Sequence, residues 1–147
     1  MYRKFNSNEN KDDDLEGKGD WLLGEDIGKS IPYLRNMANP DKAKYPQPRQ
    51  YKGDNWADPN DEKSDYGGVH INSGISNRCF FLMSKNIGLF RALRLWFRTL
   101  QDLGPTSSFI DFRDQLCKNA FKWEKNKVNE SLNKVGLTKS AVSDWRV

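Results

Sequence analysis

Histidine is nearly absent from this sequence, since His70 is the only one among its 147 residues. A single imidazole excludes an HExxH zinc helix, a zinc site with three histidines and an iron site with two histidines. The two cysteines, Cys79 and Cys117, are too few for a disulfide framework, and no CxxC pair is present to form a zinc site. Any chemistry that these residues perform alone must therefore use one imidazole or none.

Long apolar runs are also missing. No stretch approaches the roughly 20 apolar residues that a membrane helix needs, and the first residues lack the apolar core of a signal peptide. Aromatic residues, by contrast, make up 12% of the chain, and each can bury a large area. A chain of this length can bury roughly 68–70% of its unfolded surface. We therefore expect one folded domain with a real core and no membrane segment.

The N-terminal half is irregular. Residues 1–19 are rich in Asn, Asp and Lys and contain almost nothing to bury, so we expect a polar, mobile tail there and the domain over residues 20–147. Prolines and a glycine crowd residues 31–60, which predicts a long loop. Loops of this length are usually functional or disordered. Three aromatic anchors favour a functional loop: Tyr45, Tyr51 and Trp56.

The second half has the apolar periodicity of helices. Ser108 followed by Asp111 is typical of a capping box, and Gly104-Pro105 is typical of a helix end. The expected fold class is mainly α, a helical bundle that follows the irregular region. Its four predicted helices cover Ser73–Lys85, Leu89–Leu103, a segment starting at Ser108, and a last segment capped by Gly136.

The segment Leu89–Leu103 carries an apolar face with a stripe of arginines opposite to it. The apolar residues are Leu89, Phe90, Leu93, Trp96, Phe97 and Leu100, and the arginines are Arg91, Arg94 and Arg98. The stripe could contact nucleic-acid phosphates, with tryptophans as stacking surfaces, or it could be the solvated face of an amphipathic helix. The net charge is only +4 and no nucleic-acid motif is present. The solvated face is therefore favoured, and no nucleic-acid partner is expected.

The stretch from Asp65 to Gly74 has the most unusual composition. Gly67 and Gly68 permit backbone turns that a side chain would block, so a turn could bring the Asp65 carboxylate to one ring nitrogen of His70. That hydrogen bond would fix the tautomer and aim the other ring N–H outward. A histidine satisfied inside a loop is favoured by spacing alone, and a Ser-His-Asp triad is formally possible, although no GxSxG elbow supports it. The next two residues, Asn72 and Ser73, are candidate helix caps.

Several segments of the chain resemble those of the thermolysin-like neutral zinc metallopeptidases, in the same order, among them FRAL at 90–93 and NKVGL at 133–137. GGVHINSGI at 67–75 is similar, almost letter for letter, to a signature of that family. WLLGEDI at 21–27 resembles its W-x-I-G-E-D-V segment, and LRNM at 34–37 with the following Asn-Pro resembles its L-R-S-M…P loop. PTSSF at 105–109 is similar to its P-T-S-x-F element. The resemblance covers roughly residues 20–137 and implies the C-terminal, mostly helical half of a two-domain zinc endopeptidase.

The resemblance also implies roles for individual residues. His70 corresponds to the histidine that donates a hydrogen bond to the tetrahedral intermediate, and Asp65 to the carboxylate that orients it. Arg35 corresponds to the arginine that holds a backbone carbonyl of the substrate. Leu34 and Ile27 correspond to walls of the pocket for the residue after the scissile bond.

The metal sites of that family are matched less well. The HExxH helix is absent from these residues, so the zinc ligands are expected outside this chain. Asp20 and Glu25 align with acidic residues that bind structural calcium. Lys18 and Leu22 stand where the family has polar calcium ligands, which counts against a calcium site.

Two interpretations of function follow from the resemblance. In the first, the chain is the C-terminal half of a zinc metalloendopeptidase that acts on peptide or protein substrates together with an N-terminal catalytic domain. Its localisation would then be extracellular, as is usual in the family. In the second, it is a catalytically inactive remnant or a peptide-binding module. Under either, the 147 residues alone are expected neither to bind zinc tightly nor to cut peptides.

Overall fold

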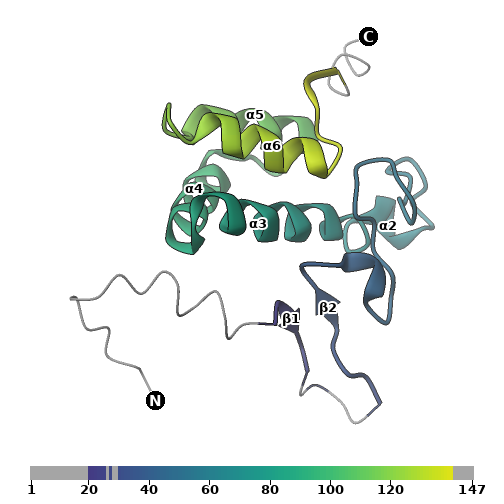
Figure 1. Ribbon diagram of the computed structural model, residues 1–147. Coiled ribbons are helices and arrows are strands. Elements are labelled where there is room, and N and C mark those ends of the chain that lie inside the picture. Colours follow the sequence, from purple (N-terminus) through teal and green to yellow (C-terminus); the bar gives the residue numbers. More distant parts are fainter. Residues whose placement is uncertain (1–19, 26, 28–29, 141–147) are drawn as a thin grey trace.

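The computed structural model describes residues 20–25, 27 and 30–140, and the tail expected over residues 1–19 lies outside the described residues. The prediction of a mainly helical fold is confirmed. In the described part of the chain, four helices of ten or more residues form a bundle (Figure 1). They are α3 (Ser73–Ile87), α4 (Leu89–Asp102), α5 (Phe109–Asn119) and α6 (Lys125–Lys134). None of the described helices is both long and apolar enough to span a membrane.

The irregular half contains short elements that the sequence pattern did not predict. Strand β1 (Leu22–Leu23) pairs antiparallel with β2 (Arg35–Asn36), with Leu22 opposite Asn36. Two residues are too few to show the alternation that marks a strand. A 3₁₀ turn, η1 (Pro40–Lys42), follows, and α2 (Asp65–Gly68) is a turn whose Tyr66 and Gly67 have left-handed backbone angles.

Helix α3 forms the centre of the bundle. It contacts α4 and α6, and in Figure 1 the α5–α6 pair lies on one side of it and the two strands on the other. Every fourth residue of α3 is buried, and this stripe consists of Ile75, Cys79, Met83 and Ile87. It packs in one cluster with Leu95, Leu116 and Leu132 from the other three helices, all of them fully buried.

Helix α4 turns a different face to the core from the one that its hydrophobic pattern indicates. The residues that it buries completely are Ala92, Leu95 and Thr99. Most of the predicted apolar face is exposed, namely Phe90, Leu93, Phe97 and Leu100. Small side chains such as alanine and threonine let helices approach closely. Close packing of α4 on α3 and α5 therefore outweighs burial of the larger side chains.

The arginine stripe of α4 is not simply a solvated face. Arg94 Nη2 lies 2.8 and 3.1 Å from the two carboxylate oxygens of Glu124, a residue with no exposed surface. The same guanidinium lies 4.0 Å from the ring centre of Phe121, and that of Arg91 lies 4.7 Å from the ring centre of Trp123. Two of the three arginines therefore link α4 to the α5–α6 connection. Arg91 remains exposed, so the expectation of a solvated stripe was wrong for Arg94 alone.

The long loop of residues 31–60, called the aromatic loop from here on, is anchored to the bundle near its C-terminal end. The backbone N–H of Tyr51 donates to the carbonyl of Val135, just after α6, with an N···O distance of 2.9 Å. The Tyr51 ring packs edge to face on Trp56, and both rings contact Phe109 at the start of α5. These contacts fix the loop against helices that lie far from it in the sequence.

Candidate functional site

The only histidine lies on a turn in which one carboxylate makes three hydrogen bonds. Asp65 Oδ1 lies 2.8 Å from His70 Nδ1, the contact that the spacing of the glycines suggested. The other carboxylate oxygen accepts the backbone N–H groups of His70 and Ile71 at 2.8 and 2.7 Å. The N–H of Ile71, with further contributions from the ring and backbone of His70, lowers the pKa of Asp65. The carboxylate is therefore charged at neutral pH and holds both the ring and the backbone behind it.

Glycines make this turn possible. Gly67 and Gly68 have φ angles of +76° and +79°, in the region where other residues are strained. A Cβ at Gly67 would stand 2.7 Å from the Pro59 carbonyl oxygen, and one at Gly68 would stand 2.7 Å from the Ala57 Cβ. The turn therefore needs both the backbone freedom and the missing side chains.

Two buried amide side chains hold the His70 turn in place through hydrogen bonds to the backbone. Asn72 donates to the Ala57 carbonyl at 2.8 Å and accepts the Ala57 N–H at 3.1 Å. Gln47, which is 2% exposed, donates to the His70 carbonyl at 2.7 Å. Gln47 was not predicted as a site residue, because its only signal in the sequence is a polar residue between two prolines of the aromatic loop.

The expectation that Asn72 and Ser73 cap α3 was wrong. Asn72 occupies the N-cap position, but its side chain makes no capping hydrogen bond, because it is used by Ala57. The Ser73 hydroxyl donates back to the His70 carbonyl at 2.6 Å. Both residues thus hold the His70 turn and leave the helix start without a side-chain cap.

The imidazole faces solvent on its other edge. The His70 side chain is 69% exposed, whereas that of Asp65 is 19% exposed. A carboxylate can only accept, so the shared proton sits on Nδ1. When Nε2 also carries a proton, it can donate to an anion that approaches from the solvent side. This is the geometry of an oriented hydrogen-bond donor.

A second group of candidate residues surrounds Gly24 in the β1–β2 region. A Cβ at Gly24 would stand 2.8 Å from both Ile27 Cδ1 and Leu34 Cβ, so both side chains lie against this glycine. The Leu34 N–H donates to the Leu23 carbonyl at 2.8 Å, which sets the start of β2. Arg35 is the next residue, and its Nη1 donates to the Leu34 carbonyl at 3.2 Å. The structure therefore brings Ile27, Leu34 and Arg35 into one group.

The described residues do not form a metal centre. Among them, no group of three or more His, Cys, Asp or Glu side chains could hold a metal ion. Asp20 uses Oδ1 to accept the Leu22 N–H at 3.0 Å, and Glu25 lies exposed in the turn after β1. The described part of the chain therefore does not fit a zinc ion by itself, and calcium at Asp20 and Glu25 would need further ligands.

Comparison with known proteins agrees with this architecture. Residues 3–137 match the alpha-helical domain of the thermolysin metallopeptidases, a range that includes most of the expected tail. The chain is 38% identical over 124 residues to neutral protease NprE of Bacillus pumilus, and equally to bacillolysin of Bacillus subtilis (strain 168). It is 33% identical over 117 residues to a zinc metalloproteinase of Renibacterium salmoninarum. The chain belongs to the thermolysin metallopeptidase family, through its alpha-helical domain.

These matches cover most of this chain but a smaller share of each relative. They include 80% of this chain for the two Bacillus proteins and 70% for the Renibacterium protein. They include 40% of the Bacillus pumilus protein, 23% of the bacillolysin and 20% of the Renibacterium protein. The resemblance therefore concerns one part of larger peptidases.

Proposed function

We propose that this chain is the helical half of a zinc-dependent endopeptidase of the thermolysin type. In this proposal His70 donates a hydrogen bond to the oxyanion that develops on the scissile carbonyl, and Asp65 orients its ring. The observation that carries the proposal is the 2.8 Å contact between Asp65 Oδ1 and His70 Nδ1, with the opposite edge of the ring open to solvent. A donor held in place before the reaction stabilises charge that appears only in the transition state.

The residues around Gly24 would bind the substrate. A guanidinium has five N–H donors, so the bond from Arg35 to the Leu34 carbonyl leaves donors for a backbone carbonyl of a peptide. Leu34 and Ile27 would line the pocket for the side chain after the scissile bond. Ile27 is 71% exposed, which suits a wall that a substrate side chain covers on binding.

The ligands of the metal ions would lie outside the described residues. The zinc ligands would belong to an N-terminal catalytic domain, because the described residues offer no metal cluster. A calcium ion at Asp20 and Glu25 would likewise need ligands from elsewhere. An extracellular location would follow from the family resemblance.

Kinetics of the complete peptidase test these roles, either in a longer parent chain or with a family N-terminal domain added. His70→Ala is expected to lower kcat roughly 10²–10³-fold with little change in KM, as loss of an oxyanion donor does. Asp65→Asn should lower kcat less, because the ring is still present. Arg35→Ala should raise KM, and Arg98→Ala, at an exposed arginine of α4, serves as its control. If His70→Ala changes only KM, the donor role is wrong.

The alternative is a catalytically inactive module that binds peptides. Such a module would need no zinc, whereas the peptidase would need zinc ligands from another domain. Metal analysis and a protease assay of the 147-residue chain, alone and with a family N-terminal domain, separate the two proposals. An active mixture supports the peptidase, whereas peptide binding without cleavage in the mixture supports the inactive module.

A further inference from the structure

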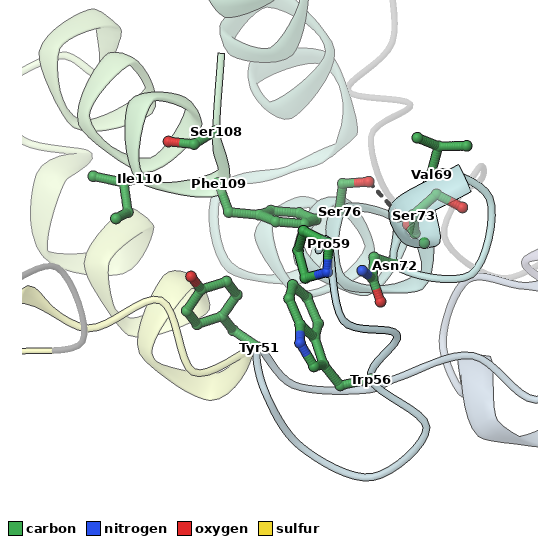
Figure 2. A pocket seen from close by; sticks show the side chains of 12 residues that line it. Tyr51, Trp56, Pro59, Val69, Asn72, Ser73, Ser76, Ser108, Phe109 and Ile110 are labelled. Atoms are coloured by element: carbon green, nitrogen blue, oxygen red, sulfur yellow. Dashed lines mark hydrogen bonds between the residues drawn. The ribbon is translucent and has the colours of Figure 1, made fainter. Parts of the chain in front are cut away.

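A cavity of about 700 Å³ lies next to the turn that carries His70. Its walls come from the aromatic loop, from the turn itself and from the first residues of α3 and α5 (Figure 2). Neither Asp65 nor His70 is among the residues that line it. Its volume lies within the range of small-molecule sites. It is therefore a site separate from the proposed catalytic side chains.

The walls of this cavity are mainly aromatic and aliphatic. Figure 2 shows Tyr51, Trp56 and Phe109 close together, and their ring centres lie 5.0 to 6.1 Å apart. Ile110 extends this wall, and Val69 lines another part of the cavity. Val69 is 60% exposed, so a ligand that covered it would gain apolar burial.

The serine and asparagine side chains in the walls already have partners within the protein. The Ser73 hydroxyl donates to the His70 carbonyl, and that of Ser76 donates to the Ser73 carbonyl, the dashed line in Figure 2. Ser108 is engaged in the capping box of α5, and Asn72 bonds to Ala57. None of the twelve lining residues carries a charge. A charged ligand would thus lose its hydration without gaining an ionic partner.

We propose that this cavity binds an uncharged aromatic or branched apolar group, supplied either by a small molecule or by a side chain of a bound polypeptide. The aromatic wall provides contact area, and the absence of charge among the lining residues excludes ionised ligands. Binding requires neither zinc nor cleavage, so the proposal stands apart from the proposed peptidase function.

The first test is a titration of the 147-residue chain with indole, followed by ligand-observed NMR. Indole should bind saturably, and indole-3-acetate should bind at least about tenfold more weakly, because its carboxylate would be buried without a partner. Equal binding of the two, or no saturable binding of indole, overturns the proposal.

Variants of two neighbouring residues locate the binding. Ser76→Phe fills the cavity from α3 and should weaken indole binding at least about tenfold, since a packed cavity has no room for the ring. Asn77→Phe is the matched control, because Asn77 is the next residue on α3, is equally intermediate in exposure and does not line the cavity. Its indole affinity should stay within about twofold. Equal loss in both variants places indole elsewhere and overturns the proposal.

A third variant does not depend on filling the cavity. Val69→Lys adds a cation at an exposed lining position, and it should strengthen binding of indole-3-acetate relative to indole. If the ratio of the two affinities stays the same, binding beside Val69 is contradicted.

A capped Gly-Trp-Gly peptide then distinguishes the two sources of the apolar group. Binding at least as tight as that of indole assigns the site to a polypeptide side chain, and weaker binding assigns it to a small molecule.

Discussion

Gly68 meets two separate requirements of the His70 turn. Its φ is +79°, and a Cβ there would stand 2.7 Å from that of Ala57. Gly68→Ala should therefore combine the strain of a left-handed residue with overpacking, and lower the free energy of unfolding by about 2–4 kcal/mol. Urea unfolding followed by circular dichroism measures this change.

Gly104→Ala is the matched control, because Gly104 has no atom within 4 Å of an added Cβ and an ordinary φ. We expect its unfolding free energy to stay within about 0.5 kcal/mol of the wild type. A Gly68→Ala variant as stable as the Gly104→Ala variant would show that the turn can rearrange at little cost.

Because the pKa of Asp65 is lowered in the folded chain, we expect the free energy of unfolding to fall in acid. The pKa of Asp111 is also lowered, chiefly by the Ser108 N–H that its carboxylate accepts in the capping box. In both cases the unfolded chain binds more protons between the two pKa values, so stability rises with pH in that range. The contribution is complete above the ordinary aspartate pKa of about 4 and is lost as the pH falls through the lowered value.

Unfolding midpoints measured on both sides of that window check this prediction. Asp65→Asn and Asp111→Asn should each flatten the loss of stability in acid. Glu62→Gln, at an exposed carboxylate, controls for removal of one negative charge. If the unfolding midpoints of the two aspartate variants fall with pH as those of the wild type do, these two carboxylates are not the source of the acid sensitivity.

At the scale of single residues, part of the candidate site could be predicted from the sequence. The Asp65–His70 contact followed from five-residue spacing and two glycines, because both are local properties of the chain. The roles of Arg35, Leu34 and Ile27 came from family resemblance alone, since nothing in their spacing indicates a pocket. Gln47 was missed because it contacts His70 across 23 residues, and local chemistry carries no information about such a contact.

At the scale of elements, the sequence predicted where helices form better than how they are oriented. The predicted segment Leu89–Leu103 is one residue longer than α4. The buried face was not predicted, because hydrophobicity ranks phenylalanine and leucine above the small residues that allow close helix contact. Gly88 alone separates α3 from α4, so the position of α4 is set largely by packing against α3.

The Arg94–Glu124 pair gives a prediction for the contact between α4 and the α5–α6 connection. Arg94→Met should lower the free energy of unfolding by about 3–5 kcal/mol, because it leaves a fully buried carboxylate with the Phe121 N–H but without its cationic partner. Chemical denaturation measures this loss. Arg98→Met, at an exposed arginine on the same helix, should change stability by less than about 0.5 kcal/mol.

The double variant Arg94→Met with Glu124→Leu separates two effects on the free energy of unfolding. One is the net contribution of the ion pair, and the other is the cost of leaving the Glu124 carboxylate buried without its partner. It should recover a large part of the loss, since both charges are removed together. A double variant as unstable as Arg94→Met alone would show that packing of the arginine stem, and not the unpaired buried charge of Glu124, dominates the loss.

At the scale of the whole molecule, α6 and the aromatic loop should unfold as one unit. Leu132 is fully buried on α6, and the Tyr51 N–H donates to the Val135 carbonyl directly after that helix. Leu132→Ala should lower stability by about 2–5 kcal/mol, and hydrogen exchange of the Tyr51 and Ala57 amides should accelerate together with that of α6. The exposed Asn133→Ala is the control. Unchanged exchange of the two loop amides would show that the loop opens on its own.

The link between the aromatic loop and the end of α6 also has a consequence for biosynthesis. Gln50 and Lys134, whose side chain and carbonyl are hydrogen-bonded, are 84 residues apart, so a ribosome needs roughly 4–17 s to travel from one to the other at typical elongation rates. For most of that interval Tyr51 and Trp56 lack Phe109, and for all of it the Tyr51 N–H lacks the Val135 carbonyl. The nascent chain therefore presents an unpaired aromatic segment to chaperones and proteases for seconds, and slow codons within α5 and α6 would lengthen this vulnerable period.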